Sequence, residues 1–283
     1  MRTLGLAKAE ALAERLPLLM VNALKVASTM AQGVHGRRRP GMGDAFWQYR
    51  PFLPGDEAGR IDWRRSGRSD RLFIREREWE AAQTVYLWRA ADPSMEWRSS
   101  KKLPLKRERA ELLLLALATL LLRGGEKLAL WGERPTGGRG ALLRIADEME
   151  TRQESSALPR PIQLPRHAEA VLIGDFLSPI AEIEINFEEI ATAGVRGHLL
   201  LLCDPAEEDL PYNGRVHFLG SNNQAEEILI PRVEPLADEY RRRFAAHRNE
   251  VRSLASKLGF TASFHRTDHS PESALLALYN GLG

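Results

Sequence analysis

Oxygen-bearing side chains follow an apolar run in the first half of the chain. The segment 87–95 reads LWRAADPSM and places Ala90, Asp92 and Ser94 at alternating positions. A loop that offers a carboxylate and two hydroxyls at such positions suits Mg²⁺, which takes oxygen ligands in octahedral geometry. Here one carboxylate and one hydroxyl are present, and Ala90 cannot coordinate an ion. The pattern therefore predicts a degenerate metal site with weak or absent Mg²⁺ binding, and no other cofactor is expected.

Three further residues follow apolar runs and could face the same crevice. Asp175 and Asp204 end the runs VLIGD and LLLLCD, and Thr136 lies in a loop after a third run. In open parallel sheets, the ligand crevice lies at the carboxyl ends of the strands. We therefore predict a degenerate site from Asp92, Ser94, Thr136 and Asp175, with Asp204 as an additional strand-end candidate.

Other reactive side chains favour structural roles. Cys203 ends an apolar strand, and a catalytic thiol would need an activating neighbour. His265, Asp268 and His269 have the chemistry of metal ligands, but such a triplet near the end of a chain favours an exposed turn. The sequence also lacks a phosphate-binding loop, a dinucleotide-binding glycine motif, an HExxH motif and a GxSxG motif. These observations predict a protein that is not an enzyme.

The elements that would position these residues alternate between strands and helices after residue 80. Strands are predicted at 84–88, 127–131, 170–173, 198–202, 216–219, 227–230 and 260–265, and helices at 106–123, 141–150, 180–192, 236–258 and 271–279. Strands separated by helices pair in parallel through right-handed crossovers. Continuous apolar strands fit a sheet that is covered on both faces. The sequence therefore predicts an α/β fold with an open, doubly wound, mostly parallel sheet.

The composition divides the chain into three parts. Residues 1–36 are predicted to form a helical segment and a linker, and residues 81–283 form the α/β domain. Residues 37–80 are an Arg-rich segment of short strands and loops, with 11 Lys and Arg against 7 Asp and Glu between Gly33 and Trp79. This segment has too few apolar residues to bury a core of its own. We therefore expect it to pack on the α/β domain.

The overall composition restricts the class of protein. Of 283 residues, 43% are hydrophobic and 28% are charged, as in soluble globular proteins. The net charge of +2 is too small for a general polyanion binder. The longest apolar run, 112–122, is interrupted only by Thr119 and is far shorter than the about 20 residues of a membrane-spanning helix. A single cysteine and acidic residues near the N-terminus argue against secretion, so we expect a cytoplasmic protein without a membrane span.

Residues 49–76, YRPFLPGDEAGRIDWRRSGRSDRLFIRE, resemble the signature of the bacterial "domain of unknown function 58" family. The resemblance rests on the PGD triplet and the RxIDW pattern at the expected spacing. The signature residues are Arg50, Pro54, Gly55, Asp56, Arg60, Asp62 and Trp63. We expect Arg60, Asp62 and Trp63 to hold the segment together through a charge-assisted pair and a buried ring.

The remaining chain is similar to the von Willebrand factor A-like (vWA-like) domain that follows this signature. LWRAADPSM takes the place of the family's metal-ion-dependent adhesion site, and LIGDFLSP takes the place of its later Asp loop. The family's first loop usually reads Asp, any residue, Ser, any residue, Ser, Met. Ala90 therefore stands where the Asp belongs, and Asp92 stands where the first Ser belongs.

The resemblance implies association with MoxR-type AAA+ ATPases, in complexes that act as chaperones or in cofactor insertion. We therefore expect a non-enzymatic protein-interaction module whose partners are such an ATPase and a client protein. One alternative is a divalent-metal-dependent hydrolase that uses Asp92, Asp175 and Asp204. A second alternative is nucleic-acid binding through residues 37–77, which the near-neutral charge disfavours.

Overall fold

A five-stranded parallel sheet forms the centre of the protein in a computed structural model. The structure describes residues 26–27, 46–52, 61–67, 71–77, 83–138, 140–151, 156–220 and 227–282. The strands run in the order β4-β3-β5-β6-β9, and every neighbouring pair is parallel. Their bounds are β3 Thr84–Arg89, β4 Lys127–Leu130, β5 Glu169–Gly174, β6 Arg196–Cys203 and β9 Thr261–Arg266. The predicted α/β fold with a parallel sheet is confirmed.

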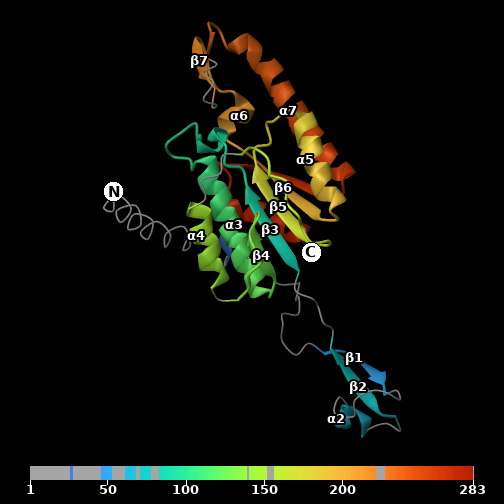
Figure 1. The fold of residues 1–283 in the computed structure, drawn as a ribbon. Helices are drawn as coiled ribbons and strands as arrows, with labels where there is room; N and C mark the ends of the chain where they lie inside the picture. The colour runs from blue at the N-terminus through green and yellow to red at the C-terminus, as the bar shows by residue number, and fades with distance from the viewer. Residues whose placement is uncertain are drawn as a thin grey trace.

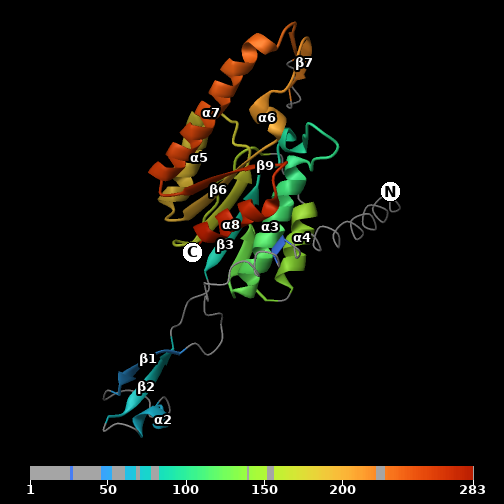
Figure 2. The same cartoon turned by 180° about the vertical axis from the view of Figure 1, so that it is seen from behind.

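Helices cover both faces of this sheet (Figures 1 and 2). One face carries α3 (Lys106–Arg123), α4 (Ala141–Thr151) and α8 (Pro271–Gly281). The other face carries α5 (Ile180–Thr192) and α7 (Glu234–Lys257). Because both faces are covered, β5 is buried along its whole length, which explains its continuous apolar sequence.

The core between the sheet and the α5–α7 layer contains a chain of aromatic rings. Trp88, Phe176, Phe187 and Phe260 follow one another with ring centroids 5.7 to 6.2 Å apart. Each is buried, and burial of a large apolar side chain contributes about 1.5–3 kcal/mol. Gly197 allows the Phe260 ring to approach β6, because a Cβ at this position would lie 2.5 Å from the ring.

A smaller lobe follows β6. It contains α6 (Pro205–Asp209) and an antiparallel hairpin of β7 (Val216–Leu219) and β8 (Glu227–Ile230). Figure 1 shows the hairpin beside the N-terminal part of α7. A second hydrophobic cluster around Leu210, Val233 and Ala237 holds this lobe together, separate from the main core.

The N-terminal third is described only in parts. Val26 and Ala27 are helical and buried, and Val26 belongs to the main core. The other residues of the helix predicted within 1–36 lie outside the described residues. β1 (Phe46–Pro51) and β2 (Phe73–Arg77) lie in the segment predicted to contain short strands, and they pair in antiparallel orientation. Residues 78–82, which join this strand pair to the α/β domain, are also outside the described part, so its packing there stays a prediction.

The structure describes only some of the family signature residues. Pro54, Gly55, Asp56 and Arg60 lie outside the described residues, and only the backbone of Arg50 is described, paired with Ile74. Asp62 is the N-cap of the one-turn helix α2 (Trp63–Ser66), and its carboxylate accepts a hydrogen bond from the Arg65 N–H at 2.9 Å.

The expectation of a buried Trp63 ring is wrong, because 66% of this residue is exposed. Trp63 is the first residue of a four-residue helix, which is too short to bury an apolar face. Among the described helices, none is both long enough and apolar enough to cross a membrane.

Candidate functional site

The carboxyl ends of β3 and β5 form the point where the sheet's connections diverge. The chain leaves β3 toward β4 on one side, whereas β5, β6 and β9 follow on the other side. Such a switch point leaves a crevice between the two strand ends, where α/β proteins bind ligands. Ser94 follows β3, and Asp175 follows β5. The Ser94 hydroxyl donates a hydrogen bond to Asp175 Oδ2 at 2.5 Å, so these two predicted site residues do meet.

Lys106 fills the centre of this site, although it is not among the residues predicted from the sequence. The residue is fully buried, and its Nζ lies 3.0 Å from Asp175 Oδ2 and 2.5 Å from Glu207 Oε1. Burial alone would lower the pKa of Lys106, but Asp175 and Glu207 raise it above its ordinary value. Burial raises the pKa of Glu207, although Lys106 opposes this change. The Lys106 ammonium therefore remains charged and joins the ends of β5 and β6 to the start of α3.

The sequence around Lys106 does contain one signal that its role is unusual. α3 begins with Lys106 and Arg107, although the N-terminus of a helix favours acidic residues. A basic residue in this position is a reason to look for carboxylates that compensate it, and the structure supplies two.

Asp204 fixes the neighbouring loop rather than facing the crevice. It is the N-cap of α6, and its Oδ1 accepts from the Ala206 N–H at 2.9 Å. Its Oδ2 accepts from the Ser99 N–H at 2.9 Å, across the loop between β3 and α3. Glu207 completes the capping box by accepting the Asp204 N–H at 2.7 Å. Asp204 therefore holds two loops together through a fully buried carboxylate.

Thr136 does not join the site, contrary to expectation. Its backbone forms an antiparallel bridge with Leu128, with hydrogen bonds of 2.7 and 2.8 Å in the two directions. Leu128 pairs with Val85, near the amino end of β3. Ser94 follows the carboxyl end of that strand, beyond Arg89, and four residues of strand span about 13 Å. The loop after β4 folds back along this edge strand, so Thr136 is carried away from the crevice.

Asp92 and Ala90 lie in the loop that follows β3, and both have structural contacts there. Asp92 is the N-cap of the short 3₁₀ helix η2 (Pro93–Glu96) and accepts from the Ser94 N–H at 3.3 Å. Its Oδ1 is buried without a hydrogen-bond partner in the described structure. Ala90 is fully buried, and its Cβ lies 3.1 Å from where a Cβ on Gly174 would stand. A small side chain at residue 90 therefore suits this tight contact.

The Mg²⁺ that the resemblance implies does not fit this arrangement of side chains. Ala90 supplies no ligand, Thr136 lies elsewhere, and Asp175 Oδ2 already accepts from Ser94 and Lys106. Within the described ranges, no group of three His, Cys, Asp or Glu side chains is arranged to hold a metal ion.

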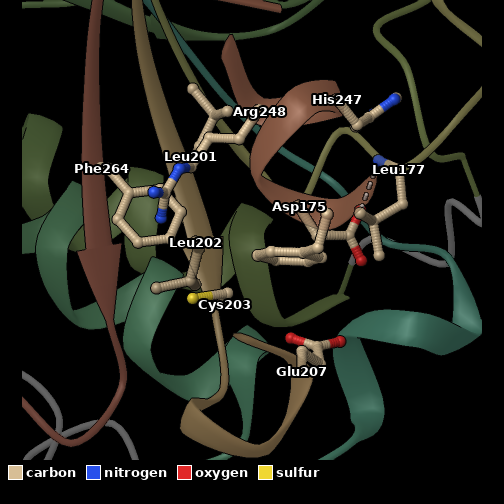
Figure 3. Close-up of a pocket in the computed structure, with 10 residues that line it drawn as sticks. Asp175, Leu177, Leu201, Leu202, Cys203, Glu207, His247, Arg248 and Phe264 are labelled. Carbon is tan, nitrogen blue, oxygen red and sulfur yellow. Dashed lines mark hydrogen bonds between the residues drawn. The ribbon is translucent and has the colours of Figure 1, made fainter. Parts of the chain in front are cut away.

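A hollow adjoins the Lys106 cluster on the side covered by α7 (Figure 3). Its lining is mostly apolar and comprises Asp175, Leu177, Leu201, Leu202, Cys203, Glu207, Phe244, His247, Arg248 and Phe264. Leu177 and Phe264 are 46% and 36% exposed at this surface. The Arg248 guanidinium lies over the Phe264 ring, 4.2 Å from its centroid, and donates to Glu208 at 2.6 Å.

The hollow contains one thiol. Cys203 is the buried last residue of β6. Burial raises the pKa of its thiol, and Glu208 and Glu207 raise it further. The thiol is therefore protonated at neutral pH, which is the opposite of what a nucleophilic cysteine needs.

The residues His265, Asp268 and His269 do not form a common site. His265 is buried and lies 2.9 Å from Arg109 Nη1, whereas His269 is largely exposed. Asp268 accepts from Arg266 at 3.0 and 3.1 Å. Their roles are structural, His265 within β9 and the other two in the turn between β9 and α8.

The parallel sheet, its two helical layers and the switch-point crevice define an α/β protein of the Rossmann or vWA-like type. Residues 48–253 match the family described as "Protein of unknown function DUF58". The match covers most of the chain, and the protein belongs to this family.

Two solved structures have a similar arrangement over 71% of this chain, each at 15% sequence identity. One is the conserved hypothetical protein BatB from Bacteroides thetaiotaomicron, with a TM-score of 0.41 and 97% of that chain covered. The other is an aerotolerance-related membrane protein from Bacteroides fragilis with multiple mutations to serines, with a TM-score of 0.39 and 98% covered. No curated protein matches the chain.

Proposed function

We propose that this protein is a non-enzymatic protein-interaction module of the cytoplasm, whose partner is a MoxR-type AAA+ ATPase acting on a client protein. The ATPase and the chaperone-like or cofactor-insertion role come from the family resemblance. The observation that supports an interaction role is the carboxyl edge of the sheet. An internal ion pair occupies its centre, and an apolar surface with exposed Leu177 and Phe264 lies beside it.

The chemistry of this edge favours binding over catalysis. The Cys203 thiol is protonated, Asp175 is held by Lys106, and Asp204 caps α6. A hydrolase needs a base or nucleophile that can reach a substrate. By contrast, an arginine stacked on a partly exposed aromatic ring is a common anchor of protein interfaces. We therefore place the partner surface at the hollow lined by Leu177, Arg248 and Phe264.

The test is binding of the purified full chain to the purified MoxR-type ATPase of the same host, measured by calorimetry. Leu177→Asp and Phe264→Asp should each weaken binding at least tenfold, because a charge would be desolvated at the contact. Ile185→Asp is the matched control, since Ile185 is 63% exposed on α5 and does not line the hollow.

Melting curves of all three variants are compared with that of the parent, and binding is scored only for variants that are folded at the temperature of the calorimetry, which separates loss of contact from loss of fold. The proposal fails if the parent does not bind the ATPase. The placement of the surface fails if the Leu177 and Phe264 variants bind as tightly as the Ile185 variant.

The hydrolase alternative predicts hydrolysis that depends on a divalent ion and is lost in Asp175→Asn. The nucleic-acid alternative predicts binding to generic DNA or RNA that falls steeply with salt. Neither has a supporting contact among the described residues.

A further inference from the structure

The side chains at the switch point disagree with the metal loop that their sequence resembles. We propose that the Lys106 ammonium is a permanent internal cation that replaces a metal ion at this edge, so the fold of its loops is independent of divalent ions. This inference concerns the architecture of the site and does not depend on the identity of the partner.

The contacts of Lys106 carry the proposal. Its Nζ contacts Asp175, which follows β5, and Glu207, which lies in α6 after β6. Ser94, which follows β3, donates to the same Oδ2 atom of Asp175. Lys106 therefore contacts the segments that follow β5 and β6 directly, and Asp175 links the same cluster to the segment that follows β3. Holding strand ends together in this way is the structural task of a metal ion at such an edge.

The location of Lys106 in the fold is explained only by these contacts. A lysine at the first position of a helix faces the positive end of the helix dipole. A fully buried lysine also loses its hydration and is unfavourable without compensation. Two carboxylates within hydrogen-bond distance supply this compensation, and the raised pKa of Lys106 agrees with it.

A divalent ion and Lys106 would compete for the same oxygen atoms. Mg²⁺ binds through carboxylate oxygens with near-ideal octahedral geometry. Here Asp175 Oδ2 and Glu207 Oε1 are the acceptors of the ammonium. An ion at these atoms would also lie beside a buried positive charge and be repelled by it. Lys106 therefore excludes the metal by occupying its ligands as well as by its charge.

The experiment removes the internal cation and asks whether an external one takes its place. Lys106→Ala should melt below the parent when a chelator is present, because Asp175 and Glu207 lose their counter-charge. Addition of Mg²⁺ should raise the melting temperature of this variant, and calorimetry should show Mg²⁺ binding at least tenfold tighter than in the parent. The parent should melt at the same temperature with Mg²⁺ and with chelator.

Lys127→Ala is the matched control, since Lys127 is exposed at the start of β4, and it should behave as the parent. If Lys106→Ala does not fold, Lys106→Gln keeps an uncharged side chain one atom shorter than lysine, with two N–H donors, and should show the same rescue by Mg²⁺ more weakly.

Three results would overturn the proposal. The first is a parent whose stability falls when metal is removed. The second is a Lys106 variant as stable as the parent in chelator. The third is a destabilised Lys106 variant, with Ala or Gln, that Mg²⁺ does not stabilise.

Discussion

Acidification should weaken the fold through the buried His265. His265 Nε2 lies 2.9 Å from Arg109 Nη1, and an arginine can only donate. The Nε2 atom must therefore accept, so the ring is neutral with its proton on Nδ1. Burial, then the charges of Arg109 and His269, lowers the pKa of His265 from 6.5 to about 4, although Asp268 acts in the opposite direction.

The linkage between protonation of His265 and folding gives the sign and size of the change in unfolding free energy with pH. In the unfolded chain this histidine takes up a proton near pH 6.5, whereas in the folded protein it does so only near pH 4. The contribution of His265 to the free energy of unfolding is therefore fully present above pH 6.5 and is lost as the pH decreases from 6.5 to 4. The difference between the two pKa values corresponds to about 3 kcal/mol of unfolding free energy at pH 4.

The assay compares denaturant unfolding of the parent and of His265→Gln at pH 7, 5.5 and 4. Glutamine does not titrate, and its side-chain oxygen can accept the Arg109 hydrogen bond. Other titrating groups act equally in both proteins, so the parent should lose about 3 kcal/mol relative to the variant. His217→Gln serves as the control at an exposed site and should follow the parent. Parallel loss of stability in the parent and in His265→Gln would refute this reasoning.

Three further substitutions or reactions test the fold directly. Gly197→Ala should destabilise the protein by about 1–3 kcal/mol in denaturant unfolding, because the new Cβ would lie 2.5 Å from the Phe260 ring; an unchanged midpoint would contradict this close contact. Cys203 should not react with an aromatic disulfide reagent at pH 8 until the protein is unfolded, because burial raises its thiol pKa. Trp63→Ala should change the unfolding free energy by less than about 0.5 kcal/mol, because the residue is mostly exposed. A larger loss would show that Trp63 packs against a part of the chain outside the described residues.

Long elements were predictable because several local signals agree in them. α3 and α5 begin and end where the apolar spacing predicts, and α3 is followed by Gly124, which ends it. The one-turn helices α2, η2 and α6 were missed, since four or five residues show no periodicity. Each nevertheless starts after an aspartate N-cap, and two have proline at the first helical position, which is a recognisable signal.

The candidate site was predictable where it depends on topology. The strand-end rule places Ser94 and Asp175 together, because both follow neighbouring parallel strands. It failed for Thr136, because the loop after β4 turns back along the edge strand through a single bridge that no sequence pattern reveals. Lys106 was missed because a lysine in the first turn of a helix is usually solvated, and its position in the sequence does not show that carboxylates from distant loops bury it.

The separate hydrophobic cluster of the β7–β8 lobe gives this lobe a local stability different from that of the main α/β core. A two-stranded hairpin with a small core opens more readily than a five-stranded sheet with two helical layers. The hydroxyl of Tyr240 donates to the Glu207 backbone carbonyl at 2.7 Å, so the lobe is tied to a residue that contacts Lys106. Local opening of the β7–β8 hairpin would therefore loosen α6 and reach the buried ammonium without unfolding the sheet. In amide hydrogen exchange, β7 and β8 would exchange first, α6 next, and the central strands β5 and β6 only with global unfolding.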